Sequence, residues 1–247
     1  MQTSLFCPLI DLIDEGTPVS APEEVVYSTQ PRKATALDGH CYYTKGPDLN
    51  IVTAELVAHQ LALELALNVP EFGIAFPDLV DGPLFASKEV PRCHRQVDPW
   101  IKRDRVTNPG MLPLLIAFDI WVMNKDRNIG NLVGHEQLAP SAGRIAIVAI
   151  DFEKSMALRG PYPLTATPNI DPRSLWPSGT LGQMMTGAPL PNDFCASIGK
   201  VGAERILDAF ARVEARINQE IPWKAGSVQL LSMRSKRIIN LVKEVWR

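Results

Sequence analysis

Residues 111–131 read MLPLLIAFDIWVMNKDRNIGN, and residues 144–152 read RIAIVAIDF. The first stretch begins with a run that is too apolar to lie on a protein surface, so we expect a buried helix there. The polar residues 124–131 then end that helix. The second stretch is a continuous apolar run rich in β-branched residues, which is typical of a buried strand, and it ends at Asp151. The sequence therefore places a polar loop between a buried helix and a buried strand.

The polar loop and the strand end carry the residues with the clearest chemistry. Asp126 precedes Asn131 by five residues, and both can point inward at one place, where Asp151 can join them. Mg²⁺ prefers such oxygen ligands and shares its coordination shell with substrate phosphates. Phosphoryl transfer needs an Asp to accept the proton of the acceptor, with an Asn and an Asp to hold the metal. A plain turn with an Asp-Arg ion pair is the alternative, and the two buried flanking elements favour the functional interpretation.

The remaining sequence predicts an α+β fold with two lobes. Residues 19–45 become β-like around a turn at Asp38-Gly39, residues 51–67 have the spacing of a helix, and two short strands follow. The two strands are expected over 74–80 and 82–90, a long loop over 159–192, and further helices over 200–219 and 227–245. We therefore expect one domain over 1–247, with a small β-rich N-lobe holding one main helix (1–92) and a larger, mostly helical C-lobe (93–247).

Composition and charge exclude several classes of protein. The chain has 247 residues, of which 46% are hydrophobic and 21% charged, as in ordinary globular proteins. With 25 Lys and Arg against 27 Asp and Glu, its net charge of -2 predicts no direct nucleic-acid partner and no attraction to anionic membranes. The longest uncharged run, 174–192, is rich in Gly and Pro and reads as a loop rather than a membrane span. The first residues lack a secretory pattern, and four cysteines without CxxC spacing fit a reducing compartment, so we expect a cytoplasmic protein.

Two segments together resemble a known family. The stretches NKDRNIGN (124–131) and AIDFEKS (149–155) look like the catalytic and metal-binding segments of HipA-like kinases, which share them distantly with phosphoinositide kinases. Upstream, YYTKG (42–46) looks like the lysine strand of that family, and residues 51–73 hold a helix glutamate at the matching place. The resemblance covers roughly residues 25–155 in consistent order, and the last 90 or so residues match only in being helical.

The resemblance implies that the two lobes form a single kinase-like domain with a bilobal protein-kinase-like fold, and it implies a role for each of five residues. Lys45 would hold the α- and β-phosphates of ATP, and Glu55 would pair with Lys45. Asp126 would be the catalytic base, while Asn131 and Asp151 would hold Mg²⁺. Asn131 is thereby assigned to the catalytic loop as well as to the metal.

The chain also departs from the family at two places. Where the family usually has His after the Asp-Arg pair, this chain has Asn128, which can make hydrogen bonds but cannot carry charge. We expect a hydrogen-bonding role there, since Arg127 and Lys125 already bring positive charge near Asp126. No glycine-rich loop precedes Lys45, so backbone amides or the side chains of Arg32 and Lys33 are the candidates for covering the phosphates.

Three functions stay open from the sequence. The first is an ATP- and Mg²⁺-dependent kinase for Ser or Thr in a protein, as in the family's toxin members. For this function the resemblance implies a bacterial protein of a toxin–antitoxin system. Its candidate substrate would be a translation-related factor, and its candidate partner an antitoxin-like protein. The second is a kinase for a small molecule or a lipid. The third is a catalytically weak nucleotide-binding or protein-interaction module, a pseudokinase.

Overall fold

The computed structural model describes residues 8–14, 16–19, 31–78, 80–136, 143–157 and 171–246. The strand-like residues expected over 27–30 and the first part of the expected loop, 159–170, lie outside these ranges. In chain order the elements are β1 (Thr17–Pro18), β2 (Arg32–Thr35), β3 (Cys41–Lys45), α1 (Leu49–Glu64), β4 (Phe72–Ala75), β5 (Leu84–Lys88), β6 (Cys93–His94), α2 (Asp98–Lys102), α3 (Met111–Val122), β7 (Leu132–Glu136), β8 (Ile145–Ala149), α4 (Gly179–Met185), α5 (Asn192–Gly199), α6 (Ala203–Ile217) and α7 (Lys224–Val245). Short 3₁₀ turns occur at Ile129–Asn131, Ser155–Ala157 and Pro172–Leu175.

An antiparallel sheet forms the N-terminal part, with the strand order β1-β2-β3-β5-β4. Strand β3 lies at its centre and pairs Lys45 with Phe85 of β5. Gly46 follows Lys45 with φ +138°, and a Cβ there would lie 2.8 Å from Leu84 Cδ2 and 2.9 Å from the backbone oxygen of Pro83. Only glycine tolerates that backbone and that approach. The chain therefore turns sharply just after Lys45, at the end of the central strand.

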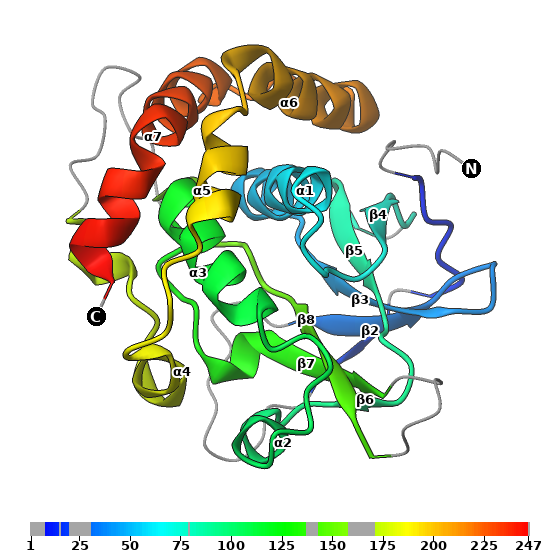
Figure 1. Cartoon of the computed structure of the whole chain (residues 1–247). Coiled ribbons are helices and arrows are strands. Elements are labelled where there is room, and N and C mark those ends of the chain that lie inside the picture. The colour runs from blue at the N-terminus through cyan, green and yellow to red at the C-terminus, as the bar shows by residue number, and fades with distance from the viewer. Residues whose placement is uncertain are drawn as a thin grey trace, which may run out of the picture.

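Helix α1 follows strand β3 in the chain and lies in the interior of the protein. The side chain of Asp48 accepts a hydrogen bond from Asn50 N at 2.8 Å, which satisfies one of the free donors at the start of the helix. Residues 52–62 are all buried, so the helix is enclosed on every side rather than along one stripe. In Figure 1, α1 lies between the N-terminal sheet and the helices α5 and α6. Such a position explains how a helix can bury a polar residue such as Glu55 beside the sheet.

The C-terminal part is built around α3 and a small sheet. Strands β6, β7 and β8 form an antiparallel sheet, in which Leu132 lies opposite Ala149. Helix α3 is buried over nearly all its length and packs against α5 and α7. Figure 1 shows α5, α6 and α7 gathered beyond α1 and α3, on the opposite side from the small sheet. No helix among the described residues has the length and hydropathy needed to cross a membrane.

The architecture confirms the predicted α+β fold class, a β-rich part with one main helix before a larger, mostly helical part. Two local expectations were wrong. The segment expected as a loop over 159–192 contains helix α4, and the strand expected over 74–80 is instead β4, which ends at Ala75. Strand β7 was not expected. The division into lobes at residues 92 and 93 stays a prediction.

Candidate active site

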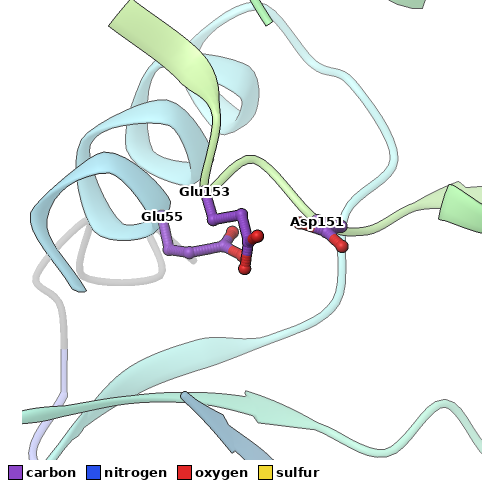
Figure 2. Close-up of side chains that lie close together, drawn as sticks. All are labelled: Glu55, Asp151 and Glu153. Carbon is purple, nitrogen blue, oxygen red and sulfur yellow. The ribbon is translucent and has the colours of Figure 1, made fainter. Parts of the chain in front are cut away.

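Lys45 lies within a ring of three carboxylates. Its Nζ is 2.7 Å from Glu55 Oε1, 2.9 Å from Asp151 Oδ1 and 3.2 Å from Glu153 Oε2. In Figure 2 the carboxylates of Glu55, on α1, and Glu153 lie together, and Asp151 lies to one side of them. Asp151 and Glu153 belong to the segment that follows β8. Oxygens of the three carboxylates lie within 4.8 Å of one another. The chain therefore brings a central strand, the main helix and the end of a distant strand together at one ammonium group.

The charges of this cluster perturb one another. Burial would lower the pKa of Lys45, but Glu55, Asp151 and Glu153 outweigh it and hold that pKa above its ordinary value. Burial raises the pKa of Glu55, although Lys45 opposes the shift. Burial also acts to raise the pKa of Asp151, but the charge and hydrogen bond of Lys45, the charge of Arg127 and the backbone N–H of Glu153 together outweigh it and lower that pKa. Three carboxylates thus compete for one ammonium, which is an arrangement that favours the entry of a further cation.

Asp151 has an unusual backbone conformation. Its φ is +64°, in the left-handed region that non-glycine residues rarely adopt. The next residue is fixed from α1, because Phe152 N donates a hydrogen bond to Glu55 Oε2 at 2.9 Å. Phe152 is fully buried. The strained residue is thus held by its neighbours, as is common where strain is retained at functional sites, and its side chain, 27% exposed, points out of the core.

The loop after α3 is ordered by two carboxamides. Asn128 Nδ2 donates to the backbone oxygen of Asp126 at 2.9 Å, and Asn128 Oδ1 accepts from Gly130 N at 2.8 Å. Asn131 Nδ2 donates to the same oxygen of Asp126 at 3.0 Å. With Nδ2 engaged there, Oδ1 is the atom of Asn131 that can ligate a metal. Both side chains therefore fold the loop around the backbone of Asp126.

Arg127 stabilises this loop from inside the protein. Its guanidinium pairs with Asp119 of α3, with 2.7 Å between Nε and Oδ2. Its Nη1 donates to the backbone oxygens of Asn131 and Ile150 at 2.9 and 2.6 Å. It also lies over the ring of Phe152, 4.7 Å from the centroid. The expectation that Arg127 supplies positive charge near Asp126 was wrong, because Asp119 neutralises it in the core.

Lys154 is the cation that contacts Asp126. Its Nζ lies 2.5 Å from Asp126 Oδ2, and the two side chains are 20% and 39% exposed. The carboxylate of Asp126 is therefore partly open to solvent.

The predicted metal-binding residues fit a divalent cation. Asp151 and Asn131 offer the hard oxygen atoms that Mg²⁺ prefers. Asn131 is also joined to the residue before Asp151, since Ile150 N donates to Asn131 O at 3.1 Å. The surplus of carboxylates around Lys45 leaves negative charge that a divalent cation would neutralise. The candidates for covering the phosphates are engaged elsewhere, because Arg32 donates to Gly16 O and Lys33 pairs with Glu89 at 2.6 Å.

The structure brings Lys45, Glu55 and Asp151 into direct contact and links Asn131 to Asp126. Sequence reasoning missed Asp119, Glu153 and Lys154. A lone carboxylate in the apolar run 111–122 was a usable signal for a buried partner of Arg127. The charged pair at 153–154 follows Asp151 directly, but nothing in the sequence gives the direction of side chains in a turn.

The fold and the arrangement of these residues have the form of a kinase. The sequence model of the HipA-like kinases matches residues 26–159, more than half of the chain. The chain therefore belongs to the HipA-like kinase family, and that membership makes it a phosphotransferase.

Two solved structures resemble the chain in fold. The proinflammatory kinase CtkA of Helicobacter pylori is 15% identical, with 95% of this chain and 98% of that chain covered and a TM-score of 0.49. A structure of WaaP in complex with acyl carrier protein is 15% identical, with 91% and 89% covered and a TM-score of 0.36. At these scores the likenesses decide nothing about activity or substrate. A search of curated proteins gives no match.

Proposed function

We propose that this chain is an ATP- and Mg²⁺-dependent kinase that phosphorylates a Ser or Thr hydroxyl of a protein. The observation that carries the proposal is the contact of Lys45 with both Glu55 and Asp151, at 2.7 and 2.9 Å. A strand lysine fixed by a helix glutamate and placed beside a metal-binding aspartate is what a kinase requires for holding nucleotide phosphates. Family membership supports phosphoryl transfer, and the protein acceptor is the part that the experiment must decide.

Each residue has a distinct task in the proposed reaction. Lys45 binds the α- and β-phosphates of ATP, and Glu55 keeps its ammonium in place. Asn131 Oδ1 and the carboxylate of Asp151 hold Mg²⁺, which neutralises charge on the phosphates when bound. Asp126, partly exposed on its ordered loop, accepts the proton of the acceptor hydroxyl.

The test is transfer of label from γ-labelled ATP with Mg²⁺ into a cell lysate whose own kinases have been inactivated. We expect label in a protein band, on phosphoserine or phosphothreonine, and a loss of about 10²–10⁴-fold for Asp126→Asn. Asp151→Asn should instead weaken the Mg²⁺-dependent binding of nucleotide.

Three outcomes would count against the proposal. Label confined to the lipid or small-molecule fraction would identify a different acceptor. An absence of nucleotide binding and of label in the wild type would indicate a pseudokinase or a non-catalytic module. Wild-type turnover by both variants would show that Asp126 and Asp151 do not have these roles.

A further inference from the structure

None of the residue roles proposed above uses the ion pair between Lys154 and Asp126. The two residues are 28 positions apart in the chain, yet Lys154 Nζ lies 2.5 Å from Asp126 Oδ2. Lys154 follows the buried Glu153 in the turn after Asp151, so a segment that carries a proposed metal ligand also carries this ammonium. The Lys154 side chain is 20% exposed, which leaves it within reach of a bound ligand.

Two other positive charges near the loop are committed elsewhere, while Lys125, the neighbour of Asp126 in the chain, is exposed. Arg127 is 2% exposed and paired with Asp119 in the core. Lys45 is enclosed by three carboxylates, and the position two residues after Asp126 is the neutral Asn128. A phosphoryl group that is transferred beside Asp126 carries charge on its equatorial oxygens, and it must be neutralised from a side that Lys45 does not occupy. Lys154 supplies an ammonium at that place.

We propose that Lys154 is a further catalytic residue, which binds the transferred phosphoryl group and fixes the carboxylate of Asp126 toward the acceptor. The inference rests on the proposed function. An ammonium has three N–H donors, and the bond to Asp126 Oδ2 uses one of them, which leaves two for phosphoryl oxygens. Held in this way, Asp126 presents its other oxygen, Oδ1, to the acceptor.

In the transfer step one bond forms, one bond breaks and one proton moves. The acceptor oxygen forms a bond to the γ-phosphorus, while the bond from that phosphorus to the β,γ-bridging oxygen breaks and ADP leaves with the electron pair. The proton of the acceptor hydroxyl passes to Asp126 Oδ1. Lys154 stays protonated throughout and donates hydrogen bonds to the carboxylate and to the transferred group.

A binding experiment separates this role from a structural one. Affinities for ADP and for a non-hydrolysable ATP analogue are measured by calorimetry, both with Mg²⁺. Because Lys154 would contact only the terminal phosphoryl group, Lys154→Ala should weaken binding of the analogue by about tenfold and leave binding of ADP within about twofold. Lys154→Arg, which keeps the charge, should restore part of the preference for the analogue.

Turnover gives a second readout. Lys154→Ala should lower kcat by about 10–100-fold with a smaller change in the KM for the acceptor, and Lys154→Arg should recover part of kcat. The matched control is Lys224→Ala, since Lys224 forms an ion pair of 2.6 Å with Glu214, is 26% exposed and lies in the helical part at the start of α7. This control should leave the affinity ratio and kcat unchanged.

The outcomes separate the inference from the proposed function. If the wild type binds nucleotide and labels its acceptor, but Lys154→Ala keeps the wild-type affinity ratio and kcat, the inference alone is wrong. A rise in kcat for Lys154→Ala would also overturn it, because the lysine would then be blocking Asp126. A wild type that neither binds ATP nor transfers phosphate overturns the proposed function and the inference with it.

Discussion

The side chain of Glu55 accepts a hydrogen bond from the backbone N–H of Phe152, with 2.9 Å between Glu55 Oε2 and the nitrogen. The other oxygen of the same carboxylate, Oε1, accepts from Lys45. One buried glutamate thus joins the end of the central strand to the residue that follows Asp151. The position of α1 therefore controls the distance between the residue proposed to hold phosphate and the residue proposed to hold metal.

Two substitutions of Glu55 should have different consequences. Glu55→Gln keeps an oxygen for Phe152 N but loses the charge that fixes Lys45, so we expect a fall in kcat/KM for ATP of about tenfold or more. Glu55→Ala also leaves a buried N–H without its partner and should lower the free energy of unfolding by about 3–5 kcal/mol. The measurements are steady-state kinetics and urea unfolding.

The control for these variants is Glu89→Gln. Glu89 pairs with Lys33 at 2.6 Å, but their side chains are 30% and 40% exposed, so we expect a change of at most about 1 kcal/mol in the free energy of unfolding. Equal effects of Glu55→Gln and Glu89→Gln on kcat/KM would contradict a special role for the buried pair.

Glu153 would compete with a nucleotide for Lys45 in this arrangement. Its Oε2 lies 3.2 Å from Lys45 Nζ, and its side chain is 4% exposed, so its charge would repel an incoming phosphate. We expect Glu153→Gln to tighten the binding of ATP in the absence of Mg²⁺ by several-fold. Fluorescence titration with and without Mg²⁺ measures the effect.

The effect of Mg²⁺ and a second variant make this prediction specific. The gain in affinity for ATP caused by Glu153→Gln should be smaller when Mg²⁺ is present, because the cation neutralises the same carboxylates. Glu71→Gln, which removes an exposed carboxylate paired with Lys88, should leave both affinities unchanged. Weaker binding by Glu153→Gln under both conditions would show instead that Glu153 holds Lys45 in its productive position.

Asn128 should act through its hydrogen bonds rather than through charge. It bonds to the backbone of both Asp126 and Gly130, so Asn128→Ala should loosen the loop and lower kcat by about tenfold. Asn128→His can make similar bonds and should keep most of the activity. The measurement is kcat across pH 6 to 8, a range that contains the ordinary pKa of His, about 6.5. A large gain for the His variant that grows as the pH falls would show that this position needs a cation, and would favour the degenerate-kinase interpretation.

The resemblance to the HipA-like kinases was needed to expect Lys45 and Glu55 at one site with Asp151. Lys45 ends a strand, Glu55 lies within a helix and Asp151 ends an apolar strand, in the order in which that family has them, and the structure places all three side by side. Strand β7 was missed because Leu132–Glu136 is short and contains Gly134, which weakens a strand pattern. The helix α4 was missed because the Gly and Pro residues around it favour a loop.

Side-chain direction accounts for the other errors. The periodicity of the apolar run in α3 gives no partner for Asp119, so the inward turn of Arg127 was not predicted. Glu153 and Lys154 are neighbours in a turn, yet one lies in the core beside Lys45 and the other reaches Asp126. Such divergence depends on tertiary packing, and no local pattern in the sequence encodes it.

His59 should make the protein sensitive to mild acid. It is fully enclosed, with its ring 4.8 to 5.0 Å from those of Phe72, Phe85 and Phe152, and Nδ1 bonds to the backbone oxygen of Glu55. Burial lowers the pKa of His59 to about 3, and the nearby cations Lys45 and Arg127 act in the same direction, against Asp151 and the bond to Glu55. Nε2 has no hydrogen-bond partner among the described residues, so a proton there would gain little.

The sign of the pH effect follows from these values. The unfolded chain binds a proton at His59 below about pH 6.5, whereas the folded chain does not until about pH 3. The stability that a neutral His59 contributes is therefore complete above pH 6.5 and is lost as the pH falls toward 3. Between pH 7 and 5 this one group should lower the free energy of unfolding by about 2 kcal/mol. Urea unfolding at pH 5, 6 and 7 measures the slope, which His59→Asn or His59→Gln should reduce and which substitution of the exposed His40 by Asn should leave unchanged. Parallel slopes for the wild type and both His59 variants would contradict this account, since the loss would then belong to the carboxylates.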